Sequence, residues 1–191
     1  ERRYDLLVDR FNNGNYNNDV NGDVRNPNAF SGGDFAGITD KRDYIAEMGF
    51  TLVSIGSIFS TSKYDGSMVL DYEELEPHFG TEEEFTQMIE ALDEKKIGVI
   101  ADFPLNGVSE DHVWAKDGLS SIPVGDGAIN WNASDETVKE KLKDAVVAFV
   151  EKYEVNGIRL TKLGDFDYAF LNEVIHAVKA VNDNLYVFST E

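Results

Sequence analysis

Apolar and polar residues alternate along the chain in two kinds of segment, which predict strands and helices in turn. Short apolar runs between polar loops are typical of buried strands. They predict five strands, at residues 4–9, 50–59, 97–103, 156–161 and 184–191. Apolar residues spaced three and four apart predict four helices, at residues 40–49, 81–96, 134–153 and 166–182. Because the strands are apolar throughout and alternate with helices, we expect a parallel sheet that is covered on both faces.

Two of the predicted helices have well-defined apolar faces and ends. The face of the helix over 81–96 consists of Phe85, Met88, Ile89 and Leu92. The helix over 134–153 has an acidic first turn, which suits the helix dipole. We expect Ser134 to be its N-cap, since a serine hydroxyl accepts hydrogen bonds from the first turn.

The polar loops indicate how the predicted sheet is arranged. No glycine-rich phosphate-binding motif follows the first strand, which argues against a dinucleotide-binding sheet. The long loops instead follow the first three strands at their carboxyl ends, as in a (β/α)8 barrel. We therefore expect an α/β fold in which residues 1–191 form one incomplete domain, the N-terminal part (about five β/α units) of a TIM barrel. Five strands do not close such a barrel, so further strands or a protein partner should cover the open sheet edge.

Composition narrows the range of partners. Hydrophobic residues make up 42% of the chain, as in an ordinary globular protein, and the formal net charge is -19. A field of this sign repels nucleic acid and favours cation binding, so we expect no nucleic-acid partner. There is no cysteine, which excludes disulfides, zinc–thiolate sites and cysteine nucleophiles.

A loop rich in Asn and Gly follows the first predicted strand, with the sequence DRFNNGNYNNDVNGD and then SGGDF. Six of its residues offer side-chain or main-chain oxygens: Asn13, Asn15, Asn18, Asp19, Gly32 and Asp34. Calcium binds about six to eight oxygens and accepts amides and carbonyls together with a few carboxylates. The alternative is a turn-rich loop in which Asn and Gly merely adopt positive backbone angles.

Five segments resemble a known family, in the correct order along the whole chain. They are DRFNNGNYNND…SGGDFAGI, YDGSMVLDYEELEPHFGT, ADFPLNGVSEDHVW, NGIRLTKLGDF and YVFSTE. Together they resemble the alpha-amylase superfamily, particularly its cyclodextrin glucanotransferase and neopullulanase-like branches. The resemblance implies a structural Ca²⁺ bound by the six loop residues named above. It also implies that residues 104–133 are the long third βα loop, a vestigial form of the family's small third-loop domain.

The same resemblance places unsuitable residues at the family's catalytic positions. Retaining glycosidases use two carboxylates about 5–5.5 Å apart, one as nucleophile and one as general acid. The nucleophile position is Thr161, and a threonine hydroxyl is a weak nucleophile without an activating base. Gly107 stands where the family has a sugar-contacting histidine, and Glu191 is a remnant of the general acid. Three more sugar-facing positions are occupied here by Asp65, Ser67 and Met68.

Other positions of the family pattern are retained. Asp102 and Asn106 end the third predicted strand, and Arg159 lies on the fourth. The resemblance implies a buried charge pair between Asp102 and Arg159, which a non-catalytic descendant would keep for stability. Tyr64 is a candidate sugar platform. We expect His112, a lone histidine, to be packed at the surface.

These patterns favour a non-catalytic alpha-amylase-like domain, stabilised by Ca²⁺, that acts as a binding or scaffold module in a larger assembly. We expect it to be secreted or at the cell surface, where free calcium is abundant. Its partner would be the remaining barrel strands, a membrane or cell-envelope protein, or an alpha-glucan. Two alternatives stay open. One is an active alpha-glucan hydrolase or transglycosylase that uses Asp165 as a recruited nucleophile, and the other is an alpha-glucan binder that does not hydrolyse.

Overall fold

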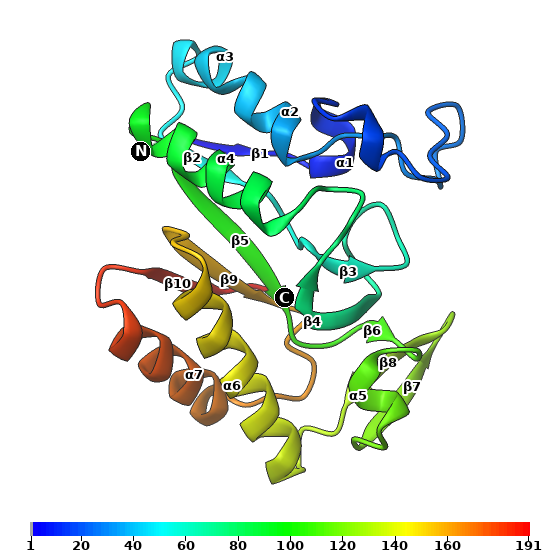
Figure 1. Ribbon diagram of the computed structural model, residues 1–191. Coiled ribbons are helices and arrows are strands. Elements are labelled where there is room, and N and C mark those ends of the chain that lie inside the picture. Colours follow the sequence, from blue (N-terminus) through cyan, green and yellow to red (C-terminus); the bar gives the residue numbers. More distant parts are fainter. Residues whose placement is uncertain (1) are drawn as a thin grey trace.

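A five-stranded parallel sheet forms the centre of the computed structural model, which describes residues 2–191 (Figure 1). In spatial order its strands are β1 (Arg3–Asp5), β2 (Leu52–Ser54), β5 (Gly98–Pro104), β9 (Gly157–Thr161) and β10 (Tyr186–Ser189). Neighbouring strands are parallel throughout, so their carboxyl ends meet at one end of the sheet. Strands β1 and β10 are the two edges. The structure thus has the parallel strands that the sequence predicts.

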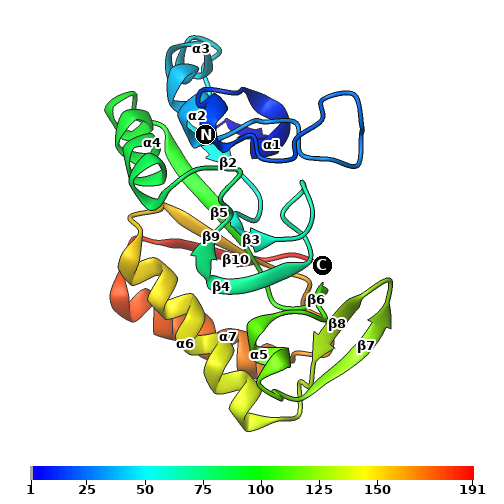
Figure 2. The ribbon, with the colours of Figure 1, turned by 45° about the vertical axis from the view of Figure 1, so that its right-hand side comes forward.

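Helices connect consecutive strands of the sheet. They are α2 (Phe35–Asp40), α3 (Arg42–Glu47), α4 (Glu82–Glu94), α6 (Glu136–Lys152) and α7 (Tyr168–Val181). Figures 1 and 2 show α2, α3 and α4 beside the β1 half of the sheet and α6 and α7 beside the β10 half. None of the helices within residues 2–191 combines the length and the apolar character that a membrane crossing requires.

Helix ends follow the local chemistry of the sequence. Thr81 and Glu84 form a capping box at the start of α4, and the predicted apolar stripe of this helix is buried. The expected cap of α6 was wrong by one residue, because Asp135 rather than Ser134 accepts hydrogen bonds from the first-turn amides. The helix predicted at 40–49 begins earlier, at the cap Asp34, and is broken into α2 and α3 at Lys41.

The predicted strand over 50–59 is divided. After β2 the chain turns at Gly56, whose φ of +74° ends the regular strand. It then enters β3 (Phe59–Thr61), which pairs in antiparallel fashion with β4 (Val69–Leu75), a strand that the apolar pattern did not indicate. The first predicted strand is likewise shorter, since β1 is followed by a helical turn, α1 (Val8–Phe11), and by a short 3-10 helix at Tyr16–Asn18.

The long third loop, residues 104–133, contains a small antiparallel sheet. Its strands are β6 (Val108–Ser109), β8 (Ala128–Trp131) and β7 (Ser121–Gly125), in that order, and α5 (Val113–Lys116) lies between β6 and β7 in the chain. The sequence pattern predicted no strand here. Residues 125–127, Gly-Asp-Gly, all have positive φ and connect β7 to β8 in a tight hairpin.

His112 is buried in an aromatic cluster, so the expectation of a surface histidine was wrong. Its ring centroid lies 4.9 Å from that of Tyr72, 5.1 Å from Trp114 and 5.0 Å from Trp131. Its side chain is 0% exposed, and Nδ1 accepts a hydrogen bond from the Trp114 amide. Burial, helped by the nearby Lys141 ammonium, lowers the pKa of His112 from 6.5 to about 4.

We predict that His112 contributes to unfolding at mildly acidic pH. A base whose folded pKa is depressed folds as the neutral form, so its contribution is intact above pH 6.5 and is lost as the pH falls towards 4. The expected loss is about 3 kcal/mol of the free energy of unfolding. Urea denaturation across this pH range should show a smaller loss for His112→Phe than for the parent chain.

The control for that comparison is His176→Phe, because His176 lies exposed on α7. It should lose stability with the same pH dependence as the parent chain. An equal loss in His112→Phe and the parent chain would contradict the assignment.

Candidate functional site

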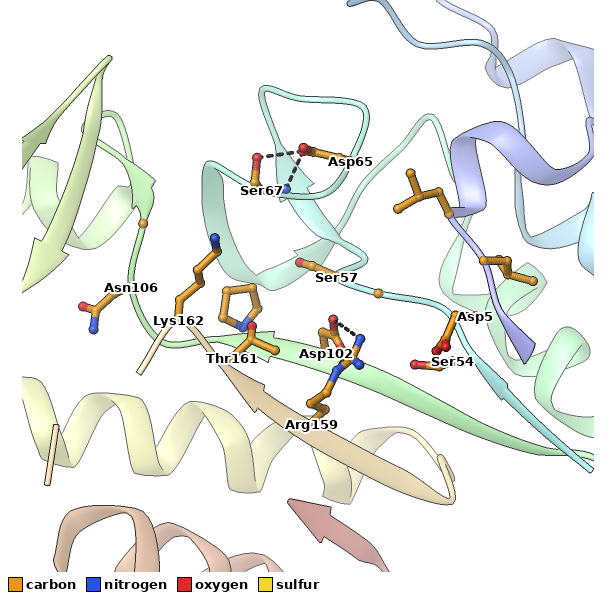
Figure 3. A pocket seen from close by; sticks show the side chains of 15 residues that line it. Asp5, Ser54, Ser57, Asp65, Ser67, Asp102, Asn106, Arg159, Thr161 and Lys162 are labelled. Atoms are coloured by element: carbon orange, nitrogen blue, oxygen red, sulfur yellow. Dashed lines mark hydrogen bonds and ion pairs between the residues drawn. The ribbon is translucent and has the colours of Figure 1, made fainter. Parts of the chain in front are cut away.

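A cavity of about 370 Å³ lies where the carboxyl ends of β1, β2, β5 and β9 meet (Figure 3). Its walls also include the loop between β3 and β4. Its polar lining residues are Asp5, Ser54, Ser57, Asp65, Ser67, Asp102, Asn106, Arg159, Thr161 and Lys162. Carboxyl ends of parallel strands are where barrels of this type place their chemistry, so this cavity is the candidate site.

Asp102 and Arg159 form a two-point ion pair within this cavity. Arg159 Nε donates to Asp102 Oδ1 at 2.6 Å and Nη2 donates to Oδ2 at 2.8 Å. The two residues lie opposite each other in the β5–β9 register, which places both side chains on the same face of the sheet. The hydrogen bonds and charge of Asp102 raise the pKa of Arg159 against the opposing effect of burial. The pair therefore stays charged, and both groups are committed to each other.

Thr161 lies two residues beyond Arg159 on β9 and so faces the same cavity. The cavity's three carboxylates all have partners. Asp5 forms an ion pair with Arg3 at 3.1 Å, and Asp102 binds Arg159. Asp65 accepts hydrogen bonds from the Ser67 amide and hydroxyl. The position after Arg-Leu thus presents a neutral hydroxyl. Each lining carboxylate has a partner, and Asp102 alone is held in a two-point, partly buried pair, since Asp5 and Asp65 are exposed.

Asn106 and Gly107 hold the third loop in place. Asn106 is buried; its Nδ2 donates to the Leu163 carbonyl at 3.2 Å and its Oδ1 accepts from the Trp131 amide at 2.8 Å. Gly107 has a φ of +63°, and a Cβ built on it would meet only Lys162, at 4.0 Å. The space beside Gly107 is open, but its positive φ favours glycine, so the backbone here is not set for a side chain.

The structure does not bring the other candidate residues into the cavity. The Tyr64 ring packs under the guanidinium of Arg10, 4.0 Å from its centroid. Asp165 lines a separate cavity of about 410 Å³ near β7 and the start of α6. Glu191 is exposed after β10, and Met68 is not among the lining residues. A recruited nucleophile at Asp165 is therefore not positioned beside Thr161.

Sequence reasoning missed four polar residues of the cavity, Asp5, Ser54, Ser57 and Lys162. The hydroxyls of Ser54 and Ser57 are buried without a hydrogen-bond partner. Lys162 points from the end of β9 towards the cavity mouth (Figure 3). Their common feature is position, since each stands at or shortly after the carboxyl end of β1, β2 or β9 in the structure, whereas the predicted strands at 4–9 and 50–59 extended past these ends.

The Asn-rich loop contains three buried oxygens with no hydrogen-bond partner, Asn13 Oδ1, Asn18 Oδ1 and Asp19 Oδ1. Both amides direct their nitrogen at a carboxylate, since Asn13 Nδ2 donates to Asp19 Oδ2 at 2.8 Å and Asn18 Nδ2 donates to Asp34 Oδ2 at 3.1 Å. Burying an unpaired oxygen costs about 1–3 kcal/mol. Amide and carboxylate oxygens of this kind are ligands that a hard cation such as Ca²⁺ accepts.

The remaining residues of the expected ligand set have structural roles as well. The carboxylate of Asp34 is buried, accepts from the amides of Gly14 and Asn15, and caps α2. Asn15 Oδ1 accepts from the Asn17 amide. A Cβ on Gly32 would lie 2.6 Å from Asn13 Nδ2, so only glycine fits beside the cluster. No group of three or more His, Cys, Asp or Glu side chains within residues 2–191 could hold a metal, so this site would be rich in amides.

A comparison with protein-family models shows the family of this chain. Residues 5–127 match the family model described as the catalytic domain of alpha amylase. The chain belongs to the alpha-amylase family. The family resemblance and the expected fold, the N-terminal part of an alpha-amylase TIM barrel, are thereby confirmed.

Related proteins extend the match beyond residue 127. A cyclomaltodextrinase of Geobacillus thermopakistaniensis is 28% identical over 96% of this chain. A trehalose synthase of Pimelobacter is 35% identical over 66% of it. The crystal structure of an Anoxybacillus alpha-amylase superposes with a TM-score of 0.92 at 31% identity over 99% of this chain. The present chain spans 37% of the length of that cyclomaltodextrinase, 22% of the trehalose synthase and 46% of the alpha-amylase.

We predict that breaking the pair between Asp102 and Arg159 destabilises this alpha-amylase-family domain. Arg159→Met should lower the free energy of unfolding by about 2–3 kcal/mol, less than for a fully buried pair because both side chains keep some solvent contact. The double variant Asp102→Leu with Arg159→Met should cost less than Arg159→Met alone, because no charge is left unpaired. Chemical denaturation of all variants measures both effects.

Lys139→Met provides the matched control for this prediction, since it removes the exposed ion pair with Glu136. Its cost should stay below about 0.5 kcal/mol. If Arg159→Met were as mild as this control, the buried pair would have no special role in stability.

Proposed function

We propose that this alpha-amylase-family domain is non-catalytic and, stabilised by Ca²⁺, serves as an extracellular or cell-surface binding or scaffold module. The observation that carries the proposal is the neutral Thr161 hydroxyl at the nucleophile position of a cavity whose carboxylates are all engaged. A retaining glycosidase needs a carboxylate that attacks the sugar and bears negative charge beside an oxocarbenium-like transition state. Thr161 supplies neither.

The cavity also lacks the features of a sugar-binding surface. None of its fifteen lining residues is aromatic. Aromatic rings provide the flat apolar surfaces on which ligand rings pack in binding sites. Tyr64, the candidate platform, contacts Arg10 outside this lining. These points favour a scaffold over an alpha-glucan binder that does not hydrolyse.

The open sheet gives the scaffold a surface for a partner. Strands β1 and β10 each have one neighbour in the sheet, so both present unpaired main-chain groups along one side. Tyr186 on β10 is 58% exposed. The proposed occupants are the remaining strands of the barrel or a partner protein, with a membrane or cell-envelope protein as one candidate.

We expect the purified protein to release no reducing sugar from starch, pullulan or cyclodextrin above a buffer control. The physical reason is the absence of an attacking carboxylate at Thr161. Calorimetry with maltooligosaccharides should show no heat of binding at millimolar ligand.

Two results would contradict this reading in different ways. Turnover that Asp165→Asn abolishes would mean an active hydrolase with a recruited nucleophile. Saturable binding of maltooligosaccharides without turnover would favour a glucan-binding function instead. Thr161→Ala is the matched control, because it should change neither assay.

We predict that chelation of calcium lowers the melting temperature and that added calcium restores it. Calcium at a hundredfold excess over its Kd should stabilise the folded chain by about 2.7 kcal/mol. Asn18→Ala removes one of the three unpartnered oxygens and should weaken this calcium effect. Asn28→Ala is the control, an exposed residue of the same loop. An unchanged melting temperature after chelation would mean that the loop is only a set of turns.

A further inference from the structure

His78, just beyond β4, contacts the Asn-rich loop both through a ring nitrogen and through the face of its ring. Its Nε2 lies 2.6 Å from the carbonyl oxygen of Val20, and its Nδ1 lies 2.9 Å from Oε2 of Glu76. Its ring stacks on Phe30 with a centroid distance of 3.7 Å and an interplanar angle of 2°. A single imidazole thus contacts two separate points of one loop and a carboxylate outside it.

The two contacted points flank the proposed ligands of the loop. Val20 directly follows Asp19, whose Oδ1 is one of the three unpartnered oxygens. Phe30 stands two residues before Gly32, which packs against Asn13 and Asp19. Contacts that hold Val20 and Phe30 in place therefore restrict the chain next to two of the proposed ligands, Asp19 and Gly32.

Glu76 connects this contact to the rigid part of the fold. Its side chain is 3% exposed, and its Oε1 accepts a hydrogen bond from the Thr61 amide on β3 at 3.1 Å. The Glu76 amide in turn donates to the Ile58 carbonyl. The loop is thereby tied through His78 and Glu76 to the β3–β4 pair.

Both atoms that face the ring nitrogens are hydrogen-bond acceptors. A main-chain carbonyl and an ionised carboxylate carry no proton to donate, so only the doubly protonated ring donates to both at once. Charged groups on the surrounding segments are Glu76 itself, Asp19 and Asp23 of the loop, and Arg10, which binds the loop carbonyls of Pro27 and Ala29. The neutral ring retains one of its two hydrogen bonds.

We propose that His78 is a positioning residue for calcium binding by the Asn-rich loop. It would set the affinity for Ca²⁺ by connecting Val20 and Phe30 of this loop to Glu76. The proposal rests on the proposed calcium site. Residues that orient metal ligands from outside the ligand set typically change metal affinity by about 10–100-fold when they are replaced.

The test compares His78→Phe with the parent chain by calorimetric titration of Ca²⁺. Phenylalanine keeps a flat ring against Phe30 and removes both donors. Its Kd for calcium should be about tenfold higher than that of the parent chain. His176→Phe, on the exposed face of α7, should match the parent.

A second measurement separates failure of this proposal from failure of the calcium site. Hydrogen exchange in metal-free protein should be faster in His78→Phe at the amides of Gly22 and Asp23, which are bonded within the loop to Asp19 and Phe30. If the parent chain binds no calcium, the calcium site is wrong, and this exchange result still tests the contact. Equal exchange and equal calcium affinity in the variant and the parent would overturn the role of His78.

Discussion

The ion pair between Asp102 and Arg159 is the constraint on which the candidate site depends. The two residues face each other across β5 and β9, and their two hydrogen bonds connect these strands on the cavity side of the sheet. A partly buried charge requires a partner, so the loss of either residue alone should lower stability. Because side chains alternate along a strand, the same register directs Thr161 into the cavity. The fold therefore directs residue 161, the proposed nucleophile position, into the cavity whatever side chain it carries.

The residues that stabilise the candidate site are separate from the residues at the proposed catalytic positions. Asp102, Arg159 and Asn106 each make bonds that stability requires, and Asn106 connects β8 to the loop after β9. Thr161 and Gly107 make no comparable side-chain bond. The stability of the fold therefore explains why Asp102, Arg159 and Asn106 agree with the family pattern. It does not explain the residues found at positions 107 and 161.

Sequence periodicity predicted the elements whose burial is regular and local. The strand over 97–103 and the helix over 81–96 agree with β5 and α4 because long apolar stripes survive in any tertiary context. Strands β4 and β6–β8 were missed, since they are short or partly exposed and gain stability from partners distant in sequence. His112 was misjudged for a related reason. The rings that bury it come from β4, α5 and β8, which no local pattern brings together.

In the Asn-rich loop, the sequence identifies the candidate ligands, and the structure shows which of their oxygens are already engaged in hydrogen bonds. The sequence offers six oxygen-bearing residues of equal standing, but the fold commits Asp34 to the cap of α2 and Asn15 to a turn. Oxygens of Asn13, Asn18 and Asp19 are left buried and unpaired. Asp34 also accepts the Asn18 amide, so the helix cap and the unpaired cluster share one carboxylate. A cation held there, as proposed, would therefore stabilise the start of α2 together with the loop.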